Sequence, residues 1–63
     1  MANYKQARQE AGMKPEQAAA RLQISLGTLF SWERGDTSPT GPQIIELAKL
    51  YGRSADFLLG LKP

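Results

Sequence analysis

Glycine and proline residues divide this chain into short segments, each long enough for a few turns of helix. Good helix formers predominate within these segments, and apolar residues recur every three or four positions. No segment shows the strict apolar–polar alternation of a half-buried strand. The segments predicted to be helical are residues 2–11, 15–22, 26–34, 42–51 and 55–59. With short connections between them, they predict an all-α, compact five-helix bundle that forms a single domain over residues 1–63.

The residues at the segment boundaries are types that start or end helices. Pro15 and Glu16 suit a first helical turn, because proline lacks the N–H that would be unpaired there and a carboxylate interacts favourably with the helix dipole. Serine oxygens cap helix N-termini, and glycine adopts the left-handed conformation that often follows the last turn. The predicted caps are Ser25 and Ser54, and the predicted stops are Gly12, Gly35, Gly52 and Gly60.

The spacing of the large apolar residues predicts which helix faces are buried. Leu29 and Trp32 lie three positions apart and share a face with Ile24, so Trp32 is predicted to be a core residue rather than a stacking residue. Because the chain has no cysteine, no disulfide can form, and the helical core has to stabilise the domain. The longest apolar stripe of this core is formed by Ile44, Leu47, Ala48 and Tyr51.

Composition argues against catalysis and against a metal site. The chain has no histidine and no cysteine, so it lacks an imidazole base, a thiol nucleophile and the usual zinc ligands. Its carboxylates are dispersed over the predicted helices, and none of its glycines follows a strand as in a phosphate-binding loop. We therefore expect no catalytic residues, no metal, no cofactor and no small-molecule ligand.

Hydropathy and charge give weaker information about location and partners. Residues 1–10 lack the apolar stretch of a secretory signal, and no apolar run approaches the roughly 18 residues of a membrane span. We expect a cytoplasmic protein with no membrane contact. The net charge is only +2 and the basic residues are dispersed rather than clustered, so charge alone does not indicate nucleic-acid binding.

The segment 15–34 has the pattern of a helix-turn-helix. Two short predicted helices are joined by a turn of roughly three to four residues. This geometry sets the second helix at a steep angle to the first and lets it protrude. A protruding helix of this kind fits the major groove of B-DNA, with its N-terminal residues against base edges.

The stretch GMKPEQAAARLQISLGTLFSWERG, followed by PT and IIELAKLYGRSADFLLG, resembles the lambda-repressor-like (Xre/Cro) family of bacterial and phage regulators. The resemblance covers about residues 4–60. It implies a five-helix fold whose third helix, residues 26–34, reads the major groove of double-stranded DNA. It also implies a sequence-specific transcriptional regulator, in most cases a repressor, that binds its operator as a two-fold homodimer. The residues that carry the resemblance best are Ala19, Leu22, Ile24, the segment Ser25 to Gly35 with Trp32 and Glu33, Pro39, and the ending from Leu47 and Ala48 to Leu59.

The resemblance also implies roles for individual residues. The outward face of the 26–34 helix would meet base edges, while the turn after it and the start of the 15–22 helix would meet phosphates. The residues implied at base edges are Ser25, Leu26, Gly27, Thr28 and Ser31, and we add Phe30, which shares a face with Leu26. Those implied near phosphates are Lys14, Glu16 and the backbone N–H groups of Thr37 and Ser38. From their charge we also expect Arg34 and Arg8 to contact phosphates. An ion pair between Arg8 and Glu33 would join the first and third helices, and a dimer interface is expected at Phe57, Leu58 and Leu59.

Several positions depart from the family pattern. Pro15 stands where a glutamine commonly holds a phosphate, and Asp36 stands where a lysine is common. Leu26, Gly27 and Phe30 stand where the family often has Arg, Gln, Ser or Asn, the residue types that read bases through hydrogen bonds. The sequence therefore predicts weak base discrimination, a shallow dependence of DNA binding on salt, and a need for dimerisation.

Two alternative hypotheses belong to a different functional class. Leu26 and Phe30 lie four positions apart on one face, and such an exposed apolar pair marks either a protein contact or contacts with thymine methyl groups. The first alternative is a helix-turn-helix domain that binds a protein partner through these two residues. The second is an antitoxin-like protein whose C-terminal surface neutralises another protein. Residues 57–59 also fit a helix end that only closes its own core.

Overall fold

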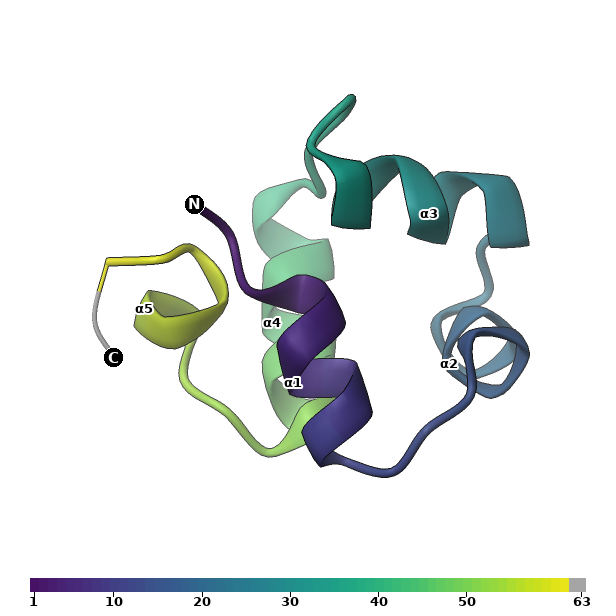
Figure 1. The fold of residues 1–63 in the computed structure, drawn as a ribbon, viewed down its shortest axis with the longest axis horizontal. Coiled ribbons are helices and arrows are strands. Elements are labelled where there is room, and N and C mark those ends of the chain that lie inside the picture. Colours follow the sequence, from purple (N-terminus) through teal and green to yellow (C-terminus); the bar gives the residue numbers. More distant parts are fainter. Residues whose placement is uncertain (62–63) are drawn as a thin grey trace.

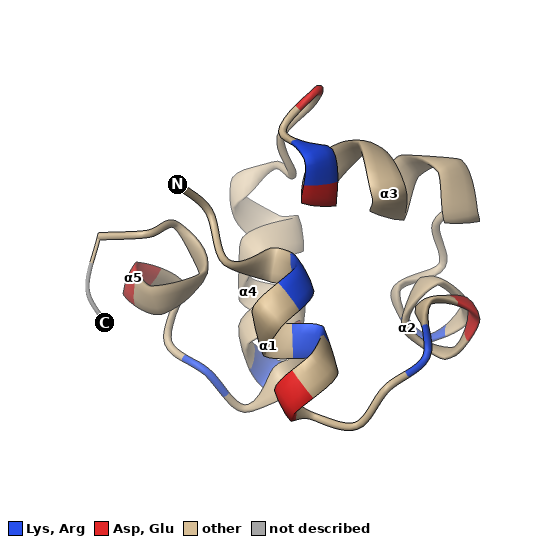
Figure 2. Cartoon of the chain, in the orientation of Figure 1, with Lys and Arg blue, Asp and Glu red and all other residues tan. Residues whose placement is uncertain are grey.

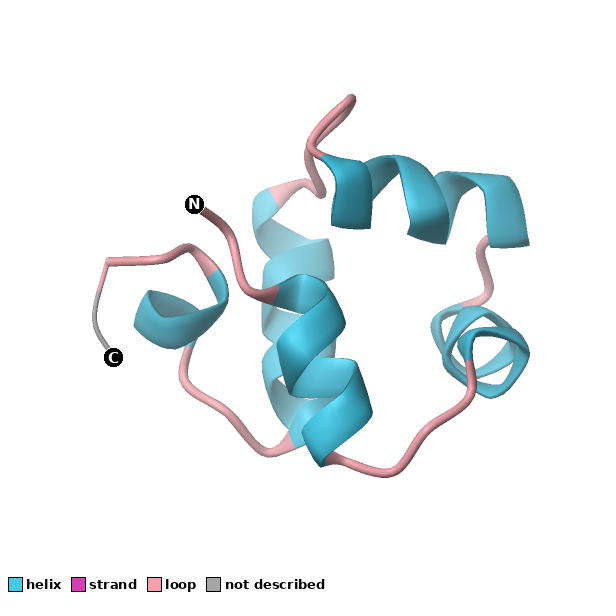
Figure 3. Cartoon of the chain, in the orientation of Figure 1, coloured by secondary structure: helices cyan, strands magenta, loops and turns pink. Residues whose placement is uncertain are grey.

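The computed structural model describes residues 1–61, which form five helices joined by turns (Figure 1). The described residues include no strand, and none of their helices is long and apolar enough to span a membrane (Figure 3). The predicted all-α, five-helix architecture is confirmed. The helices are α1 (Tyr4–Glu10), α2 (Pro15–Leu22), α3 (Leu26–Arg34), α4 (Gly41–Tyr51) and α5 (Ala55–Leu58).

The longest helix, α4, lies in the middle of the bundle and contacts three of the other helices. In Figure 1 it runs behind α1, with α5 on one side and α2 on the other, and these three are its packing partners. The remaining helix, α3, crosses one end of the bundle and packs on α1 and α2. The whole unit measures 27 × 23 × 19 Å along its principal axes.

The two helices of the predicted helix-turn-helix have the predicted bounds. α2 starts at Pro15 after an extended Lys14, and α3 starts after Ser25, whose hydroxyl oxygen accepts a hydrogen bond from the Thr28 N–H at 3.1 Å. Gly35 ends α3 in the left-handed conformation, with φ at 86°. These ends depend on residues within three positions of the boundary, which is why the sequence predicts them well.

The other three helices differ from the predicted bounds at one or both ends. α1 spans 4–10 instead of 2–11: Asn3 lies before the helix with non-helical backbone angles, φ at −117° and ψ at 35°, and its N–H bonds to the Leu58 carbonyl oxygen at 2.9 Å. α5 ends at Leu58 instead of residue 59. α4 starts one residue early, at Gly41, because Thr40 and Gln43 form a reciprocal cap: the Thr40 N–H donates to Gln43 Oε1 at 2.8 Å, and the Gln43 N–H donates to Thr40 Oγ1 at 3.3 Å.

The core is built from one buried face of every helix. Leu29, Leu47 and Leu58 are its largest fully buried side chains, and Trp32 is 4% exposed, so Trp32 is a core residue as predicted. Of the predicted stripe on α4, Ile44, Leu47 and Tyr51 are buried and Ala48 is half-buried. The remaining buried apolar residues are Tyr4, Ala7, Ala18, Ala19 and Phe57.

The N-terminal segment is held against α5 at the far end of the chain. Besides its backbone bond to Leu58, Asn3 donates from Nδ2 to the Phe57 carbonyl oxygen at 2.8 Å. Arg53, in the turn before α5, lies over the Phe57 ring, with its guanidinium carbon 3.5 Å from the ring centroid, and pairs with Glu10 at the end of α1. Both ends of α1 are therefore fixed to the C-terminal part of the fold.

Candidate nucleic-acid interface

α3 presents one buried face and one outward face. Its inner face carries Leu29 and Trp32, while no other helix covers its outer side in Figure 1. The residues predicted to meet base edges all lie outside the core. Ser25, Leu26 and Gly27 are exposed, and Thr28, Phe30 and Ser31 are half-buried.

The turn between α2 and α3 sets the direction in which α3 leaves α2. Gln23 closes α2 in the left-handed conformation, with φ at 58° and ψ at 43°. The N–H groups of Gln23 and Ile24 donate back to Ala20 O at 3.2 Å and Ala19 O at 3.0 Å. The Ile24 side chain packs against the core, so the turn is anchored by both hydrogen bonds and apolar contact.

The hydroxyl groups at the start of α3 are hydrogen-bonded to each other. Ser25 Oγ lies 2.9 Å from Thr28 Oγ1 and also caps the helix through the Thr28 N–H. A hydroxyl has one proton and two lone pairs, so each group keeps capacity for a further partner. The side chain of Ser25 therefore has a structural role in addition to its predicted contact with a base edge.

A second hydroxyl pair joins α3 to the connection that follows it. Ser31 Oγ lies 2.8 Å from Thr37 Oγ1, and the Ser31 carbonyl oxygen accepts from the N–H groups of Asp36 at 2.9 Å and Thr37 at 3.4 Å. The Thr37 N–H makes the longer of these two bonds, and its predicted phosphate contact stays a prediction. Ser38 is exposed in the same connection.

Charged side chains are sparse on this side of the molecule. Figure 2 shows that the ribbon of α3 carries charge only at its C-terminal end. There Arg34 Nε lies 3.0 Å from Asp36 Oδ2, with both side chains mostly exposed. At the start of α2, Lys14 and Glu16 are exposed, and the Lys14 N–H donates to Gln17 Oε1 at 2.9 Å.

Arg8 and Glu33 form the ion pair that the sequence predicted. Arg8 Nε lies 2.8 Å from Glu33 Oε2, and Arg8 donates from Nη2 to Glu33 Oε1 at 3.2 Å. A third bond runs from Arg8 Nη1 to the Met13 carbonyl oxygen at 3.1 Å. The hydrogen bonds to Glu33 raise the pKa of Arg8 above its already high usual value.

This pair is buried, which bears on the phosphate contact predicted for Arg8. The Arg8 and Glu33 side chains are only 7% and 5% exposed. All the nitrogens of the Arg8 guanidinium donate within the fold, to Glu33 and Met13. The buried ion pair gives Arg8 a structural role, and its predicted phosphate contact stays a prediction. The burial of Arg8 depends on how α1 packs on α3, which sequence spacing alone does not define.

The dimer interface expected at residues 57–59 stays a prediction, and two of these three residues fit the alternative of a helix end that closes its own core. Phe57 is 5% exposed and Leu58 is fully buried, so both belong to the core. Leu59 is 42% exposed. Of the three residues, Leu59 alone is available for contact with a second copy, and Leu61 and Met1 are exposed apolar residues in the same terminal segments.

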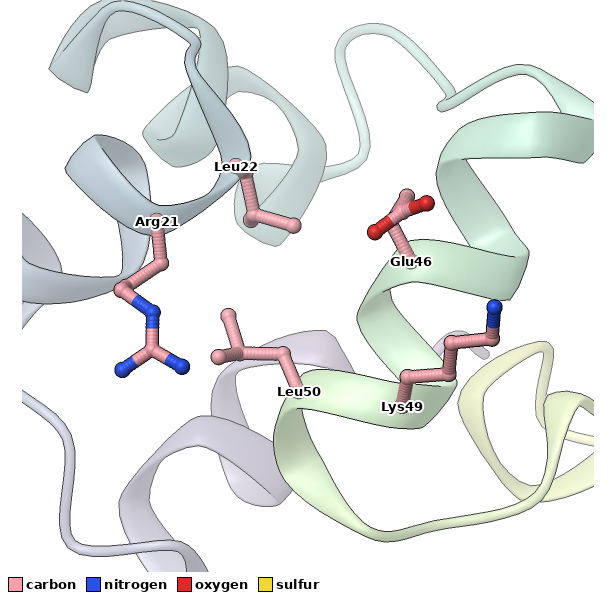
Figure 4. Close-up of a pocket in the computed structure, with 5 residues that line it drawn as sticks. All are labelled: Arg21, Leu22, Glu46, Lys49 and Leu50. Carbon is pink, nitrogen blue, oxygen red and sulfur yellow. The ribbon is translucent and has the colours of Figure 1, made fainter.

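The surface also has a hollow that the sequence did not indicate. It has a volume of about 190 Å³ and lies between α2 and α4, with Arg21 and Leu22 on one helix and Glu46, Lys49 and Leu50 on the other (Figure 4). Gln17 was also missed: it caps α2 from three residues inside the helix. The T-x-x-Q spacing at 40–43 was a readable signal for the cap of α4, whereas the K-x-x-Q spacing at 14–17 was not.

Comparison with known proteins gives two matches. The sequence pattern of the family described as helix-turn-helix matches residues 5–58. The HTH-type transcriptional regulator ImmR of Bacillus subtilis (strain 168) is 39% identical over 56 residues, which is 89% of this chain and 44% of ImmR. The chain thus spans less than half the length of this relative. No solved structure matches the chain significantly.

Proposed function

Since the chain belongs to the lambda-repressor-like helix-turn-helix family, we propose that it is the sequence-specific DNA-binding part of a transcriptional regulator and places α3 in the major groove. The observation that carries this proposal is the outward face of α3, which is uncovered by any other helix and begins with three exposed residues, Ser25 to Gly27. The N-terminal residues of a recognition helix are those that reach base edges. ImmR, which is called a transcriptional regulator, supports the same function.

The reading surface proposed here is mostly apolar, with hydroxyl groups between. Leu26 and Phe30 would contact thymine methyl groups, and Thr28 and Ser31 would use the remaining capacity of their hydroxyls on base edges. Neither apolar nor hydroxyl side chains make the bidentate hydrogen bonds by which Arg or Asn recognises a purine. We therefore expect a preference for sites rich in A·T pairs and a modest penalty for each wrong base pair.

Phosphate contacts are proposed at both ends of the helix-turn-helix. Lys14 at the start of α2 would meet the backbone on one side of the groove, and Arg34 and Ser38 would meet it on the other. With so few cations, counterion release contributes little to the affinity of one copy. We propose that two copies bind a palindromic site, with half-sites about 34 Å apart, and repress by blocking the promoter.

The first test is an NMR titration of labelled protein with a pool of random duplex DNA, at low and then at moderate salt. Chemical shift changes confined to residues 25–31 and 37–38, decreasing as salt rises, are the expected result. A double substitution of Thr28 and Ser31 to alanine should then weaken binding. If the folded protein shows no shift changes at low salt, the DNA proposal fails for this domain, and loss of a protein partner in a Leu26→Asp, Phe30→Asp variant becomes the next measurement.

A matched pair of lysine variants checks the location of the site. Lys14→Gln removes a charge at the start of α2, and Lys49→Gln removes the same charge from the hollow between α2 and α4. We expect the first variant to weaken DNA binding and to reduce the salt slope by about one unit per lost phosphate contact. The second variant should leave both unchanged. Equal losses would show that DNA does not bind at the α3 side.

A further inference from the structure

Arg34 is the cation at the C-terminal end of α3, and a neighbouring acid already pairs with it. Arg34 Nε lies 3.0 Å from Asp36 Oδ2, and the two side chains are 62% and 60% exposed. The other acid at this end, Glu33, is buried with Arg8 and contributes no exposed negative charge. Asp36 lies in the connection after α3, which Figure 2 shows as a loop that extends beyond the helix.

The position of Asp36 is fixed by the backbone around it. Gly35 turns the chain in the left-handed conformation, and the Asp36 N–H donates to the Ser31 carbonyl oxygen at 2.9 Å. One residue further, the Thr37 hydroxyl is hydrogen-bonded to Ser31 Oγ at 2.8 Å. The backbone of Asp36 is therefore placed close to Arg34 by a hydrogen-bonded turn, and the exposed carboxylate reaches Arg34 from it.

From this geometry we propose that Asp36 competes with DNA phosphate for Arg34 and lowers the affinity of the domain for duplexes of any sequence. The inference rests on the proposed function, because it concerns the same DNA-binding surface. In the free protein Asp36 takes the place of a phosphate oxygen on the Arg34 guanidinium. When DNA binds, Arg34 exchanges one partner for the other, and the carboxylate is left close to the phosphate backbone.

The exposure of the pair makes this exchange feasible. An ion pair between solvent-exposed side chains is weak, so a phosphate can replace the carboxylate without a large loss to the fold. The repulsion between Asp36 and the phosphates then remains as a cost of binding. It applies to every duplex, because phosphate contacts carry no sequence information. Affinity for a correct site thus depends more heavily on base contacts and on binding by two copies.

The test compares three single variants and one double variant by fluorescence anisotropy on labelled duplex DNA over a series of salt concentrations. Asp36→Asn removes the competing charge and keeps the size of the side chain. Glu46→Gln makes the same change in net charge in the hollow between α2 and α4, outside α3 and the connection that follows it. Arg34→Gln and the Asp36→Asn, Arg34→Gln double variant show whether the effect passes through Arg34.

We expect Asp36→Asn to raise affinity roughly two- to five-fold, the range given by the strength of an exposed ion pair. The slope of log affinity against log salt should steepen, by at most about 0.9, because one fewer negative charge opposes the phosphates in the complex. Glu46→Gln should change neither quantity, and the gain from Asp36→Asn should shrink in the Arg34→Gln background. Duplex DNA binding by Asp36→Asn alone, with none by the unmodified chain, would also support the proposal.

Three results would overturn it. The first is an unchanged affinity in Asp36→Asn while the unmodified chain binds DNA, which leaves the proposed function intact. The second is an equal gain in Glu46→Gln, which would assign the effect to net charge. The third is a gain in affinity from Asp36→Asn that is equally large in the unmodified chain and in the Arg34→Gln background. If none of the folded variants binds any duplex at low salt, the proposed function fails together with this inference.

Discussion

Ser25 illustrates how one side chain can serve both the fold and the proposed DNA contact. Its hydroxyl caps α3 through the Thr28 N–H and is bonded to the Thr28 hydroxyl, and its side chain is exposed on the proposed reading surface. An alanine variant that loses DNA binding would therefore not distinguish a lost contact from a frayed helix.

Aspartate at position 25 separates these two roles. Asp is as good an N-cap as Ser, whereas Ala costs about 1 kcal/mol. We expect Ser25→Asp to match the unmodified chain in thermal stability and to lose DNA binding, because it places a carboxylate among phosphates. Ser25→Ala should be less stable by about 1 kcal/mol. DNA binding by Ser25→Asp at full affinity would mean that the start of α3 does not enter the groove.

Tyr51 gives a prediction for alkaline pH. Burial raises the pKa of its hydroxyl to about 12, with nearby Glu33 adding to the increase. The unfolded chain loses this proton near pH 10, before the folded chain does. The free energy of unfolding is therefore unaffected by Tyr51 below pH 10 and decreases as pH rises from about 10 to 12, by on the order of 2 kcal/mol.

Tyr51→Phe should lack this decrease. Tyr51 Oη is buried and has no hydrogen-bond partner among the described residues, so removing it should also leave the stability at neutral pH unchanged or slightly higher. Burial raises the pKa of Tyr4 as well, and that smaller effect remains in both proteins. Urea unfolding at pH 7 and at pH 11 measures the difference; parallel losses in the two proteins would contradict the prediction.

At the scale of the elements, the turn between α2 and α3 contains the one non-glycine residue with a positive φ among the described residues, Gln23. A side chain in this conformation costs roughly 1–2 kcal/mol, partly offset in a glycine variant by the greater freedom of the unfolded chain. We expect Gln23→Gly to raise the free energy of unfolding by about 1 kcal/mol. Gln23→Ala, which keeps the strain, is the control and should give no gain in urea unfolding.

The ion pair between α1 and α3 predicts a strongly non-additive pair of substitutions. Arg8→Leu leaves the Glu33 carboxylate buried without its partner, which costs about 3–5 kcal/mol. A domain of this size has a free energy of unfolding of roughly 3–9 kcal/mol, so Arg8→Leu removes a large share of it and should melt well below the unmodified chain. The Arg8→Leu, Glu33→Leu double variant should recover most of the loss in thermal unfolding. A loss below 1 kcal/mol in the single variant would mean that the pair is solvated.

The elements also show where the sequence was sufficient and where it was not. α2 and α3 were predicted correctly, because Pro15, Ser25 and Gly35 act on their immediate neighbours. The predicted start of α1 was wrong because the backbone of Asn3 is not helical; Asn3 is instead bonded to α5, a contact between the two ends of the chain. The burial of Arg8 depends on the same kind of long-range packing.

The C-terminal residues show a second limit. A helix as short as α5, with four residues, has too few positions for apolar periodicity to separate the buried Phe57 and Leu58 from the exposed Leu59. The hydroxyl pair between α3 and the connection after it could not be predicted from the sequence for another reason. Ser31 and Thr37 meet only because of the turn geometry after Gly35, which residue types do not specify.

For the molecule as a whole, the packing of the N-terminus on the end of α5 can be measured with two glycines. Gly60 has a φ of 78°, and a Cβ built on it would lie 1.9 Å from the Met1 carbonyl oxygen. Gly12 has a similar φ of 72°, with no atom of the described residues within 4 Å of such a Cβ. Both alanine variants should have a free energy of unfolding lower by roughly 1–2 kcal/mol, because alanine is strained in the left-handed conformation.

Gly60→Ala should lower the free energy of unfolding more than Gly12→Ala does, because the new methyl group also has to displace Met1. Chemical denaturation of the two variants gives the difference directly. Removal of Met1 and Ala2 from both should bring their stabilities together. Equal losses in the two full-length variants would show that the N-terminus does not pack on residue 60 in solution.

The bond between Asn3 and Leu58 also has a consequence for the order of folding events. The bonds from Asn3 to α5 span 54 and 55 positions of sequence, whereas the contacts between α2 and α3 are local. Closing so long a loop is entropically unfavourable until the helices between its ends have assembled. We therefore expect this bond to form after the rate-limiting step of folding. A change at Asn3 should then act on the rate at which the native chain opens and leave the refolding rate nearly constant.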